Sequence, residues 1–531
     1  MADSPVVRPH GGVRGGETPI GSQLFQGTFG RMFRTLPPAE FSAAALTELG
    51  NAMTADADTP PPETEGDPEE NSGIAAGYTY LGQFIDHDLT FDPMSSLMRQ
   101  NDPDALVDFR TPRFDLDSVY GRGPDDQPYL YDSKNNAKAQ FLQLGAPLSG
   151  SGDPNARDLP RHTSTSGGLA RALIGDPRND ENQIVSQLQS VFLRFHNVMV
   201  SENPTASLAE VQRLVRWHYQ YVVLHDFLPT IAGSDTVHAV LPHLKSGKSI
   251  FDDPPKLHFY KFRNDPFMPV EFSVAAYRFG HSMIRPQYRV NATLKAGDPP
   301  PPNDPVNGRK SIFDPASIFD PVNDKSLSGF RALPADSAID WNLFFHLRDN
   351  APDLGVMRVQ PAYKIDTSLV NPLGGLPERV ASIIHNLAVR NLLRGNAFGL
   401  PSGQDVARAM GLRHLKDDEL KVGKATEAES PGNKSIVDTI NARVPKLGDE
   451  FKGRAPLWFY VLSEAQQQFK KDKTPIRLGP VGGRIVAETF VGLLLGDGYS
   501  FLTQDPRWHP RESKHFGMRD IIRKVVAKGG V

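Results

Sequence analysis

The chain has 531 residues, enough for one very large core or for two or three ordinary domains, and its 58 Lys and Arg against 62 Asp and Glu give a net charge of -4. This charge excludes the basic surface that nucleic acid or anionic lipid requires, and since no apolar run approaches roughly 18 residues we expect a soluble protein without a membrane span. Zero cysteines exclude disulfides, thiolate-ligated iron and Cys-based zinc sites, so any metal needs His and oxygen ligands.

The N-terminal 35 residues are rich in Gly, Pro and Arg and lack the apolar core of a signal peptide. They predict an N-terminal extension over residues 1–35 that is flexible or forms an arm, followed by a catalytic domain over residues 36–531. Residues 55–70 are acidic and Pro-rich, and we expect a loop there. Without a signal, the protein is expected to be cytoplasmic or secreted by a signal-independent route.

Helical periodicity dominates the rest of the chain. Residues 182–201 and 208–228 repeat their apolar positions on one helix face, and further helices are expected over residues 378–393 and 483–495. Strand-like alternation is scarce, and the intervals 296–325 and 367–377 have the composition of loops. The sequence therefore predicts a mainly α fold with long irregular loops and little β structure.

Three polar stretches interrupt this pattern, and the first is Tyr80-Leu-Gly-Gln-Phe-Ile-Asp-His-Asp-Leu89. In a helix Gln83 and His87 share a face, whereas Asp86 and Asp88 lie about 200° apart and point to nearly opposite sides. The apolar neighbours indicate a buried turn, in which polar side chains need partners. Taken alone, the pattern also fits a solvated helix end with a capping Asp.

The second stretch is Gly175-Asp-Pro-Arg-Asn-Asp-Glu-Asn182, directly before a predicted helix, and alone it is an ordinary helix N-terminus. The third is Tyr277-Arg-Phe-Gly-His281, in which the small Gly280 would let a flat cofactor approach the histidine closely. A lone histidine in such a place is more often a core residue than a ligand. Each stretch by itself therefore has a simple structural explanation.

Together and in this order, the three stretches resemble the animal-type heme peroxidases, the superfamily of myeloperoxidase, lactoperoxidase, peroxidasin and the cyclooxygenases. They are similar to the distal helix, the distal arginine segment and the proximal segment of that family, and Asn391-Leu-Leu-Arg394 resembles the segment that holds the partner of the proximal histidine. The resemblance spans roughly residues 75–500 and suggests a cysteine-free, bacterial-type member. Because residues 83 to 394 would then converge on one heme, it implies a single catalytic domain.

The resemblance implies a role for each matched residue. The heme iron would be ligated by His281, and peroxide would be cleaved by His87 as the base and Arg178 as the cation that stabilises the departing oxygen. The other implied roles are water or halide binding by Gln83, acceptance of the His281 N–H by Asn391, and pairing with a heme propionate by Arg394.

The resemblance also implies that Asp86 and Glu181 form ester links to the heme. Residue 182 is Asn where myeloperoxidase has the methionine of its sulfonium link, so that link and efficient chloride oxidation are not expected. A calcium site is implied as well, with oxygen ligands from Asp88, Thr111, Arg113 (through its carbonyl), Asp115 and Asp117. An acidic surface loop is the simpler interpretation of residues 111–117.

The function implied is reduction of hydrogen peroxide with oxidation of halides, thiocyanate or small aromatic donors through a ferryl heme intermediate, as in a response to oxidative stress. One alternative is a heme-dependent fatty-acid dioxygenase of the same superfamily, which needs a radical-forming tyrosine three residues before the proximal histidine, where this chain has Arg278. Another is a catalytically silent calcium-binding or adhesion scaffold, which would not need to retain Gln83, His87 and Arg178. Without disulfides, a monomer is expected.

Overall fold

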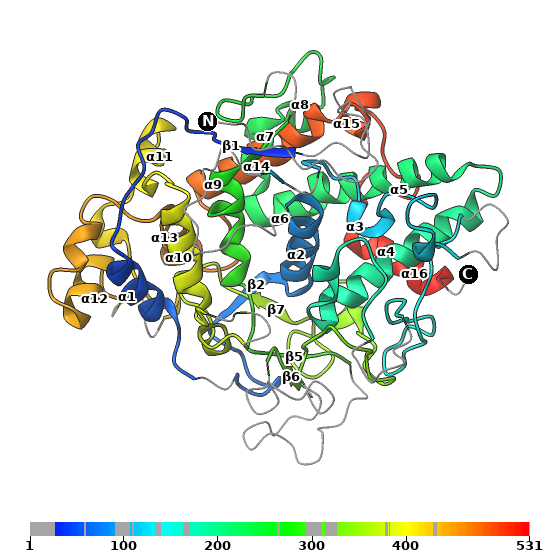
Figure 1. Cartoon of the computed structure of the whole chain (residues 1–531), viewed down its shortest axis with the longest axis horizontal. Helices are drawn as coiled ribbons and strands as arrows, with labels where there is room; N and C mark the ends of the chain where they lie inside the picture. Colours follow the sequence, from blue (N-terminus) through cyan, green and yellow to red (C-terminus); the bar gives the residue numbers. More distant parts are fainter. Residues whose placement is uncertain are drawn as a thin grey trace, which may run out of the picture.

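The computed structural model describes residues 27–57, 60–90, 107–108, 111–132, 140–162, 170–262, 266–291, 309–313, 326–377, 381, 383–427 and 433–529. These residues are mainly helical, as predicted, with long irregular connections (Figure 1). The α-helices are α1 (Ala43–Met53), α2 (Gly77–Leu89), α3 (Asp117–Tyr120), α4 (Gln183–Glu202), α5 (Leu208–Val222), α6 (Leu228–Ala232), α7 (Ser234–Val240), α8 (His243–Ser246), α9 (Val270–Ser273), α10 (Leu387–Ala397), α11 (Gly403–Ala409), α12 (Ile436–Arg443), α13 (Leu457–Asp472), α14 (Pro480–Gly496), α15 (Phe501–Gln504) and α16 (Met518–Lys528).

Among the described residues the β structure consists of short strands, which confirms the prediction of little sheet. They are β1 (Gly27–Gly30), β2 (Glu70–Ala75), β3 (Val107–Asp108), β4 (Met268–Pro269), β5 (Gln287–Arg289), β6 (Arg309–Ser311) and β7 (Pro361–Tyr363). Strand β1 lies between β3, antiparallel, and β4, parallel, while β2 pairs with β7 and β5 with β6, both antiparallel. These small sheets fasten loops to the helical body.

The predicted helices are largely confirmed. Residues 182–201 and 483–495 correspond to α4 and α14, and residues 208–228 form α5, which continues through a π-helical turn, Val223–Phe227, into α6. The helix predicted over residues 378–393 begins at Leu387 within the described residues, because the Asn386 side chain accepts hydrogen bonds from two backbone N–H groups of the first turn and so caps α10. The predicted start, residues 378–380, lies outside the described residues. Within 296–325 the described residues are 309–313, which include β6.

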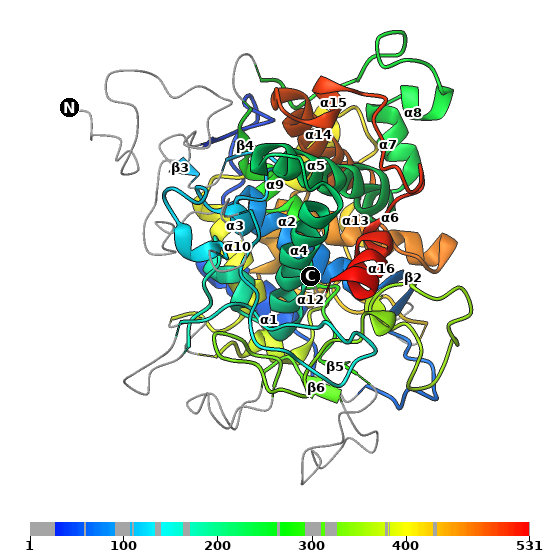
Figure 2. The same cartoon turned by 90° about the vertical axis from the view of Figure 1, so that its right-hand side faces the viewer.

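Helix α2 lies near the centre of the molecule in both views (Figures 1 and 2). On one side Phe84 stacks on Phe192 of α4, with ring centroids 4.6 Å apart. On the other side the Tyr277 hydroxyl donates to the Gly82 carbonyl at 3.2 Å, from the 3-10 helix η5 (Ala276–His281). The helix that carries His87 is therefore fixed between α4 and the segment that ends in His281.

Residues 27–35, the described end of the predicted N-terminal extension, contact the helical body. Arg31 donates to the carbonyl oxygens of Phe398 and Gly399 at 2.7 and 3.1 Å, just beyond the C-terminus of α10. The buried Glu271 carboxylate of α9 accepts from the backbone N–H groups of Met32 and Phe33, each at 3.1 Å. These contacts bridge the elements that carry Asn391 and precede His281.

Helix α14 is buried along most of its length, and the carboxyl group of Glu464 accepts hydrogen bonds from backbone N–H groups at its N-terminus. Glu464 of α13 accepts from the backbone N–H of Val481 at 2.8 Å and from that of Gly482 at 3.4 Å. Burial raises the pKa of Glu464 to about 7, and these two hydrogen bonds oppose the rise. Within the part of the chain described above, no helix combines the length and hydropathy needed to span a bilayer.

Replacing Glu464 by Gln should change how stability depends on pH. Since its folded-state pKa of about 7 exceeds the ordinary 4.5, the native protein holds a proton that the unfolded chain releases, and the free energy of unfolding falls as pH rises through that window. The Glu464→Gln variant should lose up to about 1.4 kcal/mol per pH unit of that slope, measured by urea denaturation at pH 5, 6, 7 and 8. An unchanged slope would contradict this assignment.

Candidate active site

His87 lies on α2 and faces the segment that follows Gly175. Its side chain is buried, and Nδ1 lies 2.7 Å from Oδ1 of Asn179, in the short 3-10 helix η3 (Pro177–Asp180). The Asp176 side chain begins η3 by accepting from the backbone N–H of Arg178 at 2.8 Å. Two predicted residues, His87 and Arg178, are thus brought together from segments about 90 residues apart.

The Arg178 guanidinium is anchored to both segments. Its Nη2 donates to a carboxylate oxygen of Asp176 at 2.7 Å and to the backbone carbonyl of His87 at 3.0 Å. The carboxylate also accepts from Nε of the same guanidinium, which makes the pair bidentate. A fixed cation therefore lies beside the turn that carries His87.

Gln83, one turn before His87, joins this group through its amide. It donates to the Glu181 carboxylate and accepts from Nδ2 of Asn182 at 3.1 Å. The Asn182 oxygen meanwhile caps α4, accepting from the N–H groups of Ile184 and Val185 at 3.1 and 2.9 Å. The start of α4 and the middle of α2 are therefore linked through one asparagine.

The two carboxylates predicted to bind heme covalently lie close together. Burial raises the pKa of Glu181 to about 7, with Asp176 and Asp86 adding to the rise and Arg178 opposing it. Burial also raises the pKa of Asp86, against the attraction of Arg178 and Arg278. Asp86 is therefore attracted by two cations, Arg178 from η3 and Arg278 from η5.

On the other side of the site, His281 ends η5 and contacts Asn391 of α10. Nδ2 of Asn391 lies 2.8 Å from Nδ1 of His281, while Oδ1 accepts from Nη1 of Arg278 at 2.8 Å. The predicted pair is present, but the amide turns its nitrogen toward the imidazole because Arg278 takes the oxygen. Burial lowers the pKa of His281 to about 3, helped by Arg278 and Arg390, so the imidazole is neutral at ordinary pH.

Arg278 and Arg390 lie near His281, and Arg394 lies near Arg278. Burial lowers the pKa of Arg278 to about 10, and the nearby Arg394 and Arg390 add to the effect. The Arg394 guanidinium lies over the Phe398 ring at 5.0 Å. Next to His281, a Cβ built on Gly280 meets no described atom within 4 Å. A neutral imidazole, gathered cations and open space beside a glycine together suit a flat, negatively charged group such as heme with its propionates.

A second cluster lies at the other edge of α2, where Asp88, Asp115 and Asp117 place carboxylate oxygens within 4.8 Å of one another. Asp88 is fully buried, and Thr111 donates to Asp115 at 2.6 Å. Arg113 is also buried, and its backbone N–H donates to the Thr111 carbonyl at 2.7 Å. The structure therefore brings the five predicted calcium ligands into one region, with Asp88 directly after His87.

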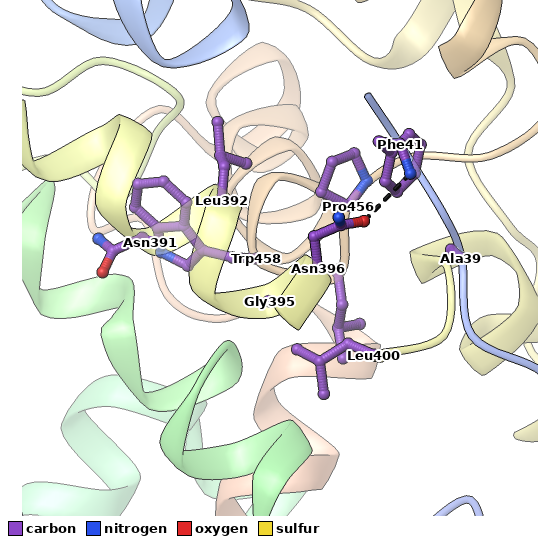
Figure 3. A pocket seen from close by; sticks show the side chains of 10 residues that line it. Ala39, Phe41, Asn391, Leu392, Gly395, Asn396, Leu400, Pro456 and Trp458 are labelled. Atoms are coloured by element: carbon purple, nitrogen blue, oxygen red, sulfur yellow. Dashed lines mark hydrogen bonds between the residues drawn. The ribbon is translucent and has the colours of Figure 1, made fainter. Parts of the chain in front are cut away.

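A small cavity lies behind Asn391, between α10 and the start of α13 (Figure 3). Its volume is about 10 Å³, room for about one water molecule. Asn391 and Trp458 lie together, and Asn396 accepts from the Phe41 N–H at 3.0 Å. The Trp458 indole donates to the Arg278 carbonyl at 3.2 Å, so this region supports η5 from behind.

Comparison with known proteins agrees with this geometry. The family model of the animal haem peroxidases matches residues 98–427, more than half of the chain, and the chain belongs to that family of heme proteins. The matched range includes Arg178, Glu181, His281, Asn391 and Arg394, while His87 and the rest of α2 lie just before it.

Individual relatives are distant. A peroxidase-like protein of Margaritifera margaritifera is 27% identical over 302 residues, which are 49% of this chain and 34% of that protein. Thyroid peroxidase of Canis lupus familiaris is 24% identical over 302 residues, 52% of this chain and 28% of that protein. The chain thus spans about a third of the length of these relatives.

Two solved structures share the fold over almost the whole chain. Peroxidase A from Dictyostelium discoideum has a TM-score of 0.56 at 14% identity, covering 96% of this chain and 94% of that one. A fatty acid alpha-dioxygenase of Oryza sativa has a TM-score of 0.55 at 16% identity, covering 93% and 82%. At these identities the likeness establishes the fold, within which both a peroxidase and a dioxygenase occur.

Asn179, Asp176 and Arg278 are partners of predicted residues that could not be identified from the sequence. Asn179 and Asp176 stand in the motif of Arg178, but a motif does not say which side chain turns toward α2. Arg278 stands where a dioxygenase would have its tyrosine, and this position alone does not indicate a contact with Asn391. A covariation signal with His87 or Asn391 would be the kind of signal that could find them.

The double role of Asn182 can be tested by two substitutions. Asn182→Ala should lower the free energy of unfolding by about 1 kcal/mol, because α4 loses its N-cap. Asn182→Ser keeps a capping oxygen and should retain most of that stability, although it loses the bond to Gln83. Urea denaturation followed by circular dichroism measures both, and equal losses in the two variants would show that the cap contributes little.

Proposed function

We propose that this protein is a heme peroxidase that reduces hydrogen peroxide at the expense of small anionic or aromatic electron donors. The observation that carries the proposal is that Asp86 interacts with arginines from two different sets of candidate site residues. One set holds His87 and Arg178, and the other holds neutral His281 beside Arg278. Family membership supports heme as the group that lies between them.

Each set has a chemical task. A heme bound here would have His281 as its ligand and Arg394 and Arg278 near its acidic groups. It would supply the two electrons that reduce hydrogen peroxide. His87 would accept a proton from one peroxide oxygen and return it to the departing one. Arg178, held by Asp176, would stabilise the negative charge on that departing oxygen, and Gln83 would orient the peroxide or a water.

The dioxygenase alternative is less well supported by the residues present. Tyr277 is adjacent to the position at which that chemistry needs a tyrosine, and Arg278 occupies the position itself. The Tyr277 hydroxyl donates to the Gly82 carbonyl, and its ring stacks on Phe272 with centroids 4.6 Å apart. Burial raises the pKa of this hydroxyl well above its ordinary value, which disfavours loss of its proton.

The proposal is tested by loading the purified protein with heme and mixing it with hydrogen peroxide in a stopped-flow spectrometer. We expect a Soret band that shifts with peroxide in the wild type. His281→Ala should lose the native spectrum, and His87→Ala should keep it while the peroxide reaction slows by roughly a hundredfold or more. His515→Ala changes an exposed histidine and serves as the control.

Three outcomes would contradict the proposal or a part of it. If the protein takes up no heme, the scaffold alternative is favoured. If heme is bound but the His87→Ala variant reacts with peroxide as fast as the wild type, His87 is not the base. Oxygen uptake with a fatty acid, without added donor, would instead support the dioxygenase alternative.

We further propose that Asp86 and Glu181 form ester links to the heme. Each ester joins a carboxyl oxygen to a methyl carbon with loss of two hydrogens, which one hydrogen peroxide takes up as two water molecules. After incubation with peroxide, wild-type heme should remain on the polypeptide in acidified organic solvent. The double variant Asp86→Asn, Glu181→Gln should release its heme, as judged by mass spectrometry, and wild-type heme that extracts freely would contradict the proposal.

A calcium ion is proposed for the cluster of Asp88, Asp115 and Asp117, completed by Thr111 and the Arg113 carbonyl. Three carboxylates close together suit a hard cation with six to eight oxygen ligands. Removing calcium with a chelator should lower the Tm of the wild type, and added calcium should restore it. Asp117→Ala should abolish this response while the exposed control Asp125→Ala keeps it, and a calcium-independent wild-type Tm would contradict the site.

A further inference from the structure

We propose that Asn179 and Gln189 are positioning residues that fix the tautomer of His87, through hydrogen bonds that end on the Ser118 carbonyl. The inference rests on the proposed function, because it concerns how His87 is prepared to act as a base. It assigns a role to two buried amides that do not themselves take part in the proton transfer.

The chain of hydrogen bonds is continuous. Nδ1 of His87 lies 2.7 Å from Oδ1 of Asn179, and Nδ2 of Asn179 donates to Oε1 of Gln189 at 2.8 Å. Nε2 of Gln189 then donates to the Ser118 backbone carbonyl at 3.0 Å. Asn179, Gln189 and Ser118 are each fully buried, so water does not compete for these groups.

The direction of the chain follows from its last acceptor. A backbone carbonyl can only accept, so Gln189 must face Ser118 with its nitrogen and Asn179 with its oxygen. Asn179 must then present its nitrogen to Gln189 and its oxygen to His87. Because that oxygen accepts, the proton of the neutral imidazole sits on Nδ1, and Nε2 keeps the lone pair that a base needs.

The Ser118 carbonyl, at which the chain of hydrogen bonds ends, is itself held in place. The Ser118 carbonyl also accepts from the Gly175 N–H at 3.0 Å, so two donors share its two lone pairs. A Cβ at Gly175 would lie 2.3 Å from the Asp117 carbonyl oxygen, which is why only glycine allows this close approach. The Ser118 carbonyl therefore joins the loop before η3 to α3, whose first residue, Asp117, belongs to the carboxylate cluster.

Helix α4 offers a matched control for Gln189. Gln187 is also buried, and its amide also donates to a backbone carbonyl, that of Ser337 at 2.9 Å, and accepts from the Ile339 N–H at 2.7 Å. Its bonds lead away from His87. A loss of stability common to both glutamines can thus be separated from an effect on the imidazole.

The experiment measures the ring-nitrogen chemical shifts of 15N-histidine-labelled protein, before heme loading and in the diamagnetic ferrous carbon monoxide form. His87→Gln assigns the signals. The wild type should show the Nδ1–H tautomer, and Gln189→Leu should show a mixture because Asn179 can then turn over. Gln189→Glu, which still accepts from Asn179, should retain Nδ1–H, and Gln187→Leu should leave the His87 signals unchanged.

The peroxide reaction gives a second readout. Gln189→Leu should slow it by about fivefold, the effect of about one hydrogen bond on the tautomer equilibrium, and Gln189→Glu should recover most of the rate. A wild-type Nε2–H tautomer, or one pure Nδ1–H tautomer in Gln189→Leu, would overturn the inference. If heme or peroxide reactivity fails, the tautomer in the heme-free protein still tests the inference separately from the proposed function.

Discussion

Helix α4 is buried on nearly every side, so each polar side chain on it must find a partner inside the protein. Several of those partners lie in the irregular loops. Gln183 donates to the Ser326 carbonyl, Arg194 pairs with Asp153, and Asn197 both donates to and accepts from the backbone of Leu142. Long loops, which would otherwise gain little from hydrophobic burial, are thereby fixed to one central element.

The same constraint shapes the site. Asn182 and Gln189, near the start of α4, reach Gln83 and Asn179, so one helix positions both the amide and the imidazole of α2. The carboxylate cluster is connected to His87 in two ways. Asp88 is its neighbour in the chain, and Ser118, the residue after Asp117, is linked to it by the hydrogen bonds through Gln189 and Asn179. An ion bound in the cluster would therefore stabilise the backbone at both ends of the hydrogen-bond chain that holds the imidazole.

Several residues of the candidate site could be predicted from the sequence because three short stretches, taken together and in order, resemble one family, whereas each stretch alone has a simple structural explanation. The structure places the stretch around His87 against the segment that holds Arg178 and Asn179. The orientation of amides could not be predicted, since it depends on partners far away in the sequence, as with Asn391 and Arg278, which are 113 residues apart. The first residue of α10, Leu387, could not be predicted either, because a single capping residue, Asn386, outweighs a longer apolar pattern.

The charges of the site follow from its two unlike halves. On the α2 side, burial makes carboxyl groups such as Glu181 weaker acids, while on the η5 side burial makes Arg278 a weaker base. Each shift reduces the charge that is confined in a poorly solvated space.

Arg278 gains some stabilisation from the Asn391 oxygen, at the expense of the imidazole that competes for it. An anion close to Arg278 would satisfy the guanidinium better than an amide can, and the Asn391 oxygen would then be available to accept from the Nδ1–H of His281. The orientation of Asn391 and the charge near Arg278 are therefore coupled.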